Sequence, residues 1–289
     1  MYSLYSFRTH IFYIALIGCL VTYQNCSNVK FSTNSKTGGG VNVLSCDPQD
    51  IKCIPAPLVD KPGVVTILLA FGDSDNLPNP TVDQVSAQLV AEKMVQYASP
   101  VTNPKVLVVL DLNHHGESPD DFRNLWQNLL FRYSPNHIDE PVDGLKASDL
   151  IGYDVVWLVN PGFPMGKQST FDTLKAFAGG VILSGDDMSS GNGFNTSSLT
   201  GLTRIDNGIQ VTCNGQVYDI NNNAYPNSYI VSLDAMKFPD LGSAHLSFTY
   251  GNDIDNTTAL AELEVLVWAK PSPTACTAKR PVVVRYPKN

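Results

Sequence analysis

The sequence lacks a surplus of basic residues and carries little charge overall. Charged residues make up 16% of the chain, and 19 Lys and Arg stand against 27 Asp and Glu, which gives a net charge of −8. Nucleic-acid binding depends on a basic face that neutralises phosphates. We therefore exclude a nucleic-acid partner and note that an acidic chain attracts cations instead.

The apolar run near the N-terminus is too short to span a bilayer. Residues 11–22 (IFYIALIGCLVT) are almost wholly apolar, whereas a spanning helix needs about 20 such residues. The run follows Arg8, the one charged residue in residues 1–10. A basic start and a short apolar stretch are typical of a signal peptide, which we predict over residues 1–25. A short anchor that is never cleaved is the alternative.

Cysteines are few: of the six, Cys19 lies within this apolar run and Cys26 lies shortly after it. Leu16-Ile17-Gly18-Cys19 resembles a lipobox, the bacterial motif whose cysteine is acylated before cleavage. Tyr23-Gln24-Asn25-Cys26 matches less well, because the residue before the cysteine is usually small. Cleavage before Cys26, however, leaves an even number of cysteines to pair outside the cytoplasm. We predict lipidation of Cys26, with Cys19 as the alternative.

The other cysteines are spaced for disulfides rather than for zinc. Their positions are Cys46, Cys53, Cys213 and Cys276. The first two could close a small loop and the last two could then pair, although four cysteines allow three connectivities. A zinc site is the second interpretation, but no CxxC spacing supports it. Residues 26–62 read as the lipidated cysteine and a flexible tether, since they are rich in Ser, Thr, Asn and Gly and then in Pro.

Residues 63–289 read as one α/β domain. Continuous apolar runs predict buried strands at 64–71, 106–110, 154–159 and 181–184. Apolar residues at helical spacing predict helices between them, at 81–98, 120–132 and 169–178. This alternation indicates a mostly parallel sheet with helices on both faces.

The pattern changes in the C-terminal third. Short alternating runs over 209–233, separated by Asn-rich turns, predict antiparallel hairpins, and 263–268 and 281–286 predict closing strands.

Acidic residues follow the predicted strands. In an open parallel sheet, ligands bind beyond the carboxyl ends of the strands. The residues that would meet there are Asp73, Asp75, Asp111, His114, Asp186 and Asp187. Carboxylates suit Mg²⁺ or Ca²⁺, and His114 would extend the choice to Zn²⁺ or Mn²⁺. The alternative is that these residues only cap helices and form turns. No GxSxG motif marks a nucleophile, so no catalytic residue is assigned.

One stretch of the chain resembles a known family. Tyr153-Asp154-Val155-Val156-Trp157-Leu158-Val159-Asn160-Pro161, then a helix, then Gly179 to Asp187 (GGVILSGDD), is similar to the strand–helix–strand–elbow segment of the class I glutamine amidotransferase-like fold. The resemblance implies a flavodoxin-like sheet. Asp187, however, stands where the family has its nucleophilic cysteine, and no His-x-Glu follows. Because a carboxylate cannot perform thiolate chemistry, the resemblance does not imply amidotransferase activity.

The sequence therefore predicts a lipoprotein of the bacterial cell envelope, facing the periplasm or the cell surface. Its partners would be the membrane, through the lipid anchor, and a protein or surface ligand. We expect the domain to be a binding or interaction module, with a divalent cation as its cofactor. A metal-dependent extracytoplasmic hydrolase is the alternative, and a structural lipoprotein without a small-molecule site is the third interpretation.

Overall fold

The computed structural model describes thirteen segments of the chain. They are residues 54–68, 82–110, 122–159, 167–185, 197–202, 205–206, 210–213, 216–219, 229–233, 246–247, 253–254, 263–271 and 280–288. All of them belong to one compact unit, Val43–Asn289. The predicted signal peptide, both candidate lipidation sites (Cys19 and Cys26), and Cys46, Cys53 and Cys276 lie outside these segments.

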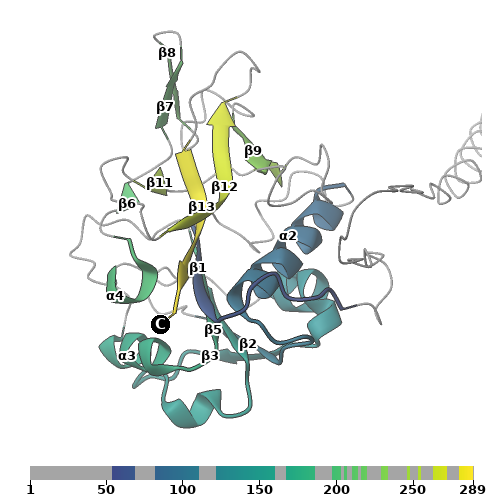
Figure 1. Ribbon diagram of the computed structural model, residues 1–289, viewed down its shortest axis with the longest axis vertical. Coiled ribbons are helices and arrows are strands. Elements are labelled where there is room, and N and C mark those ends of the chain that lie inside the picture. The colour runs from purple at the N-terminus through teal and green to yellow at the C-terminus, as the bar shows by residue number, and fades with distance from the viewer. Residues whose placement is uncertain are drawn as a thin grey trace, which may run out of the picture. The chain divides into compact units, whose positions relative to one another are not determined.

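A mixed nine-stranded sheet forms the centre of this unit, in the order β10-β9-β12-β13-β1-β5-β4-β2-β3. The part from β1 to β3 is parallel. It consists of β1 (Gly63–Ile67), β5 (Gly180–Ser184), β4 (Val155–Val159), β2 (Val106–Leu110) and β3 (Asn136–Asp139) (Figure 1). The predicted α/β class is confirmed.

The rest of the sheet is antiparallel. It consists of β13 (Arg280–Pro287), β12 (Glu264–Pro271), β9 (Tyr229–Leu233) and β10 (Leu246–Ser247), and β13 pairs with both β1 and β12. Two small ribbons accompany the sheet: β7 (Gln210–Cys213) with β8 (Gln216–Asp219), and β6 (Ile205–Asp206) with β11 (Asp253–Ile254). The predicted closing strands and antiparallel hairpins are thus present in the C-terminal third.

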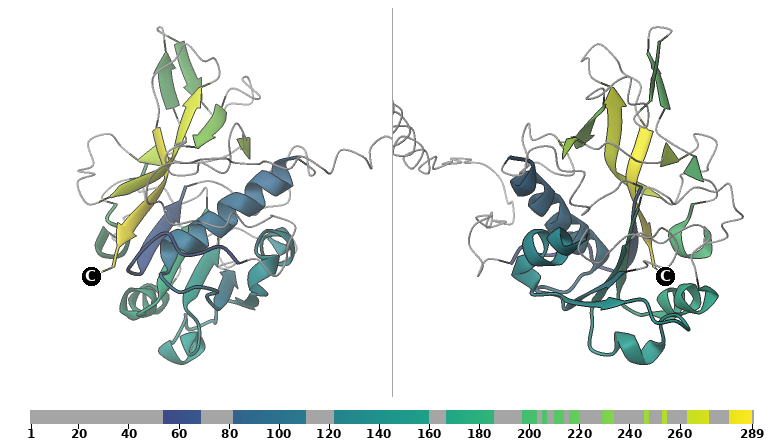
Figure 2. Two further views of the ribbon diagram at one scale, coloured as in Figure 1. Left: turned by 45° about the vertical axis from the view of Figure 1, so that its right-hand side comes forward. Right: turned by 180° about the vertical axis from the view of Figure 1, so that it is seen from behind.

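Helices cover both faces of the sheet, as the right-hand view of Figure 2 shows. On one face lies α2 (Val82–Ala98), which packs with η3 (Leu125–Leu129) in one apolar cluster. On the other face lie α3 (Gln168–Ala176) and α4 (Ser197–Thr200), which contribute to a second cluster. Every residue of β1, β2, β4 and β5 is buried, which explains their continuous apolar sequences.

The predicted helix over 120–132 takes a different form where it is described. It consists of a π-helical turn, η3, followed by the 3-10 turn η4 (Phe131–Tyr133). In the π turn the amide of Leu130 donates to the carbonyl of Leu125 over 2.9 Å. This wider i to i+5 spacing allows both leucines to be buried in the same core. The segment ends at Ser134, whose φ of 43° is left-handed.

Residues 54–62 run along the domain before β1 begins. The amide of Leu58 donates to the carbonyl of Gln96 at the end of α2 over 3.2 Å, and Ile54 and Val59 pack against the core beneath α2. The last part of the predicted tether therefore contacts the domain.

Candidate functional site at the carboxyl ends of the parallel strands

The parallel strands end in one row. Ser184 of β5 is in register with Ile67 of β1 and with Val159 of β4. Val159 in turn pairs with Leu110 of β2, and Leu110 with Asp139 of β3. The chain therefore leaves all five strands at the same edge of the sheet, which is where ligands bind in open α/β sheets.

The predicted site residues follow these strand ends. Asp73 and Asp75 come after β1, Asp111 and His114 after β2, and Asp186 and Asp187 after β5. All six lie outside the described residues. The structure places the strand ends from which they continue, and these ends share one edge.

The strand order divides the six residues into two groups. Because β1 and β5 are neighbours, the four aspartates that follow them start from adjacent strands, whereas β4 separates β5 from β2. Neighbouring strands lie about 4.8 Å apart, so the ends of β5 and β2 are about 10 Å apart. The chain order changes direction between β2 and β4, and such a switch point is the usual ligand crevice. Asp111 and His114 follow the strand on one side of it.

A buried hydroxyl lies at the end of β5. Ser184 is 1% exposed, and its Oγ accepts a hydrogen bond of 2.8 Å from the indole Nε1 of Trp157 on β4. The amide of the next residue, Gly185, donates to the carbonyl of Ile67 over 3.1 Å and so ties β5 to β1 one step beyond the paired residues. The sequence alone does not pair Ser184 with Trp157. A tryptophan within a buried strand was the available signal, since its N–H needs an acceptor.

Sequence reasoning missed a buried acid at the same edge. Glu140 directly follows β3 and is 6% exposed, and its amide donates to the carbonyl of Leu110 over 2.9 Å. The hydroxyl of Thr170, in the first turn of α3, donates to its Oε1. Thr170 also accepts a hydrogen bond of 2.8 Å from the amide of Leu145. Nothing in the local sequence (HIDEP) separates this glutamate from its exposed neighbours.

These contacts fix the first turn of α3 against residues 140–146. Ser169 Oγ donates to the carbonyl of Asp143 over 2.6 Å. Gly144 allows the close approach, because it has a φ of +82° and a Cβ there would lie 2.2 Å from Ser169 Oγ. A carboxylate is favourable near the positive end of a helix. Glu140 therefore has a structural role, the anchoring of the start of α3.

A second group of buried polar side chains joins α2 to η4, away from the strand ends. Arg132 and Glu92 form an ion pair of 3.1 Å. Burial raises the pKa of Glu92, while Gln88 and Arg132 act in the opposite direction. Burial, reinforced by Glu92, also raises the pKa of Tyr133. These residues hold η4 on α2 and do not contribute to the candidate site.

The comparisons with known proteins give no family. No protein-family model, curated protein or solved structure matches this chain. Among the residues that the structure describes, no three His, Cys, Asp or Glu side chains are grouped so that they could hold a metal ion. In the same part of the chain, no helix has the length and apolar character needed to cross a membrane.

Proposed function

We propose that this chain is a bacterial envelope lipoprotein whose α/β domain is a binding or interaction module, with a divalent cation bound beyond the carboxyl ends of its parallel strands. The observation that carries the cation site is the adjacency of β1 and β5, whose paired ends lead into Asp73, Asp75, Asp186 and Asp187. Carboxylate oxygens are the ligands that Mg²⁺ and Ca²⁺ prefer. The net charge of −8 is compatible with such an ion.

The proposed location depends on the N-terminal sequence. Arg8, the apolar run at 11–22 and the cysteines at 19 and 26 are arranged as in an exported lipoprotein. The acyl chains on the lipidated cysteine would hold such a protein on a membrane without a spanning helix. Mass spectrometry of the mature N-terminus tests this point, and an acylated Cys19 would refute the preference for Cys26.

We further propose that the parallel half of the sheet is amidotransferase-like. Support comes from the order β3-β2-β4-β5-β1. It reproduces the flavodoxin-like order 2-1-3-4-5, with the first strand of this chain in the last position. With Asp187 in place of the cysteine, the scaffold would bind a ligand rather than form a thioester.

Cation titration of the full chain in detergent tests the proposed site. We expect isothermal titration with Ca²⁺, Mg²⁺, Mn²⁺ and Zn²⁺ to detect at least one bound ion, and that ion to raise the melting temperature. Asp187→Asn should weaken binding. Asp60→Asn is the matched control, because Asp60 is exposed and precedes β1 at the opposite end of that strand. The absence of binding by all four ions would contradict the proposal.

A metal-dependent hydrolase is the second candidate. The observation in its favour is the switch point between β2 and β4, since Asp111 and His114 follow β2. Hydrolysis of generic ester or phosphate substrates that is lost in Asp187→Ala, and retained in Asp60→Asn, would favour the enzyme over the binding module.

A further inference from the structure

The outer side of β3 presents backbone hydrogen-bonding groups to an open edge of the sheet. β3 is the last strand in the sheet order, and no strand of the described segments pairs with its outer side. The amide of Glu140 donates to the carbonyl of Leu110 on β2, and alternate residues of a strand direct their backbone groups to opposite sides. Ile138 therefore faces β2, whereas the N–H and C=O groups of His137 and Asp139 face outward.

Two prolines limit the length of this edge. Pro135 and Pro141 share the alternation of His137 and Asp139, so they also face outward, but proline has no N–H to donate. The strand is preceded by Ser134, whose left-handed φ of 43° ends η4. From 135 to 141, the outward donors are therefore the amides of His137 and Asp139.

These two residues complement each other across a two-fold axis. In an antiparallel pair centred on Ile138, His137 lies opposite Asp139 of a second copy, and Asp139 lies opposite His137 of that copy. Both are hydrogen-bonded pairs, which exchange two bonds each, and both bring an imidazole to a carboxylate. The neighbouring registers would place His137 opposite His137, or Asp139 opposite Asp139, and like charges directly opposite each other are unfavourable.

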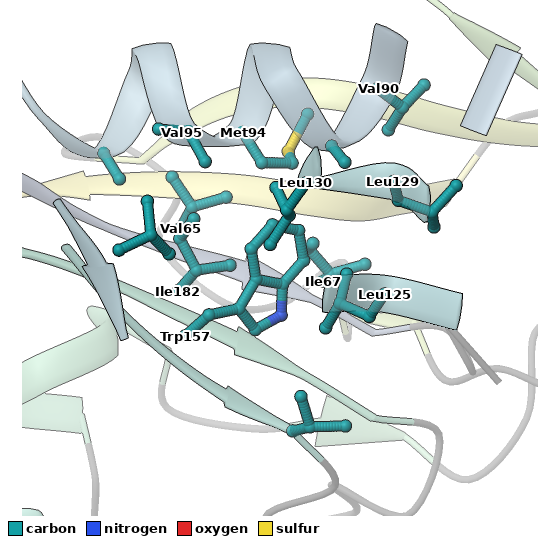
Figure 3. Packing of buried hydrophobic residues seen from close by; sticks show 14 of the residues in the cluster. Val65, Ile67, Val90, Met94, Val95, Leu125, Leu129, Leu130, Trp157 and Ile182 are labelled. Atoms are coloured by element: carbon teal, nitrogen blue, oxygen red, sulfur yellow. The ribbon is translucent and has the colours of Figure 1, made fainter. Parts of the chain in front are cut away.

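The side chain of His137 is held in place by the domain. Its ring stacks on that of Trp126, with centroids 4.6 Å apart and the ring planes 14° apart. Trp126 belongs to η3, and Leu125 and Leu129 of the same turn are buried in the apolar cluster that contains Trp157 (Figure 3). A side chain that is already ordered loses less conformational entropy when it binds.

We propose that β3 is an interaction surface for a second copy of this chain, and that two copies pair antiparallel through β3 in the register centred on Ile138. The result is a two-fold dimer in which the sheets of both copies join at this edge. A contact of four residues on each side buries little surface, so the dimer is weak and depends on concentration. The surface is separate from the proposed cation site.

A protected edge makes a different prediction. Short length, charged side chains and proline also keep edge strands from pairing, and β3 has all three features. If they serve only that purpose, the chain stays monomeric at every concentration. The oligomeric state and the register of any contact therefore separate the two roles.

Disulfide cross-linking of the full chain, in detergent with micelles in excess, tests the register. The copies of residue 138 would be a non-hydrogen-bonded pair, with Cα atoms about 4.5 Å apart, which a disulfide can bridge. Residue 136 lies on the same face of β3, but its two copies would be four residues out of register, about 14 Å apart. We expect Ile138→Cys to form a covalent dimer on oxidation and Asn136→Cys to match the wild type, which measures cross-linking through the native cysteines.

A proline substitution tests the backbone bonds. Asp139→Pro removes an N–H that faces away from β2, so the fold should tolerate it, but each copy of the dimer loses one donated bond. We expect the dimer Kd, measured by sedimentation between about 10 μM and 1 mM, to rise about 10-fold. Asp139→Ala is the matched control, because it removes the carboxylate and keeps the N–H; its Kd should rise less.

Each contrary outcome overturns the proposal. A wild type that is monomeric over the whole range would show that the edge is protected. Equal cross-linking of Ile138→Cys and Asn136→Cys would show random collision or another register. A dimer as strong in Asp139→Pro as in Asp139→Ala would place the contact elsewhere. A melting temperature of Asp139→Pro far below that of Asp139→Ala would show that this N–H is bonded within one copy.

Discussion

Arg132 of η4 and Glu92 of α2 form an ion pair inside the domain. Their side chains are 1% and 3% exposed, and Arg132 Nη1 lies 3.1 Å from Glu92 Oε2. The pair joins segments that are 40 residues apart in the sequence. Transfer of both charges from water costs more than their attraction returns unless the geometry is good. The pair therefore determines how η4 docks on α2 more than it adds to stability.

We expect Arg132→Met to destabilise the protein by about 3–5 kcal/mol, because it leaves Glu92 buried without its cation. The double variant Glu92→Met, Arg132→Met should recover most of this loss, since apolar replacements of a buried pair are often neutral or stabilising. Urea unfolding measures both changes. The control is Arg123→Met, at an exposed arginine just before η3. A double variant that is no more stable than Arg132→Met would contradict the argument.

The pH dependence of stability should report Glu92. Burial raises the pKa of Glu92 above its ordinary value of 4.5, so the folded state binds this proton more tightly than the unfolded state. The contribution of Glu92 to the free energy of unfolding is fully present below its ordinary pKa of 4.5 and is lost as the pH rises through the raised pKa of the folded state. We expect the stability of Glu92→Gln, which cannot ionise, to improve relative to that of the wild type as the pH rises above 4.5. A constant difference between the two proteins over that range would show that the pKa of Glu92 is not raised.

The sequence predicted those elements whose environment is uniform along their length. The strands β2, β4 and β5 are buried on both faces, so each appears as an apolar run. The edge strand β3 was missed because its sequence, NHID, is mostly exposed and has no apolar signal. The π turn over Leu125–Leu129 was predicted as an ordinary α-helix, since the pattern of apolar residues does not specify which hydrogen bonds form.

The candidate site could be predicted only in outline. The order of apolar runs and acidic residues indicated one common edge, and the register of the strands agrees with this. Which strands are neighbours cannot be read from the sequence, because it depends on long-range pairing. The Trp157–Ser184 hydrogen bond joins residues 27 apart, and the bond between Thr170 and Glu140 joins residues 30 apart. Both depend on strand order and on the docking of α3.

Gly63 at the start of β1 provides space for a buried arginine of the last strand. The Nε of Arg285 donates to the carbonyl of Tyr97 over 2.8 Å, and Nη2 donates to the carbonyl of Lys61 over 2.9 Å. A Cβ at Gly63 would lie 2.8 Å from Arg285 Nε. We expect Gly63→Ala to destabilise the protein by about 1–3 kcal/mol through overpacking, as measured by urea unfolding.

A double-mutant cycle separates this clash from a backbone effect. In an Arg285→Gln background, Gly63→Ala should cost less, because the shorter side chain leaves room for the methyl group. An equal cost in both backgrounds would mean that the glycine is required for another reason.

Lys288, close to the C-terminus, ties the end of the chain to the end of α3. Its Nζ donates to the carbonyls of Leu174 over 3.0 Å, of Gly179 over 3.3 Å, and of Phe177. Burial lowers the pKa of Lys288 to about 8, so between about pH 8 and its ordinary value of 10.5 the unfolded state binds more protons than the folded state. Stability from this group therefore rises with pH across that window.

Lys288→Met should remove this rise, and it should lower stability at all pH values, because the three carbonyls lose their donor. The measurement is urea unfolding from pH 7 to pH 10.5, with Lys175→Met as the control at an exposed lysine of α3. A wild type and a Lys288→Met variant with parallel pH profiles would show that the ammonium is not perturbed. A Lys288→Met variant as stable as the wild type at pH 7 would show instead that these hydrogen bonds do not hold the C-terminus in place.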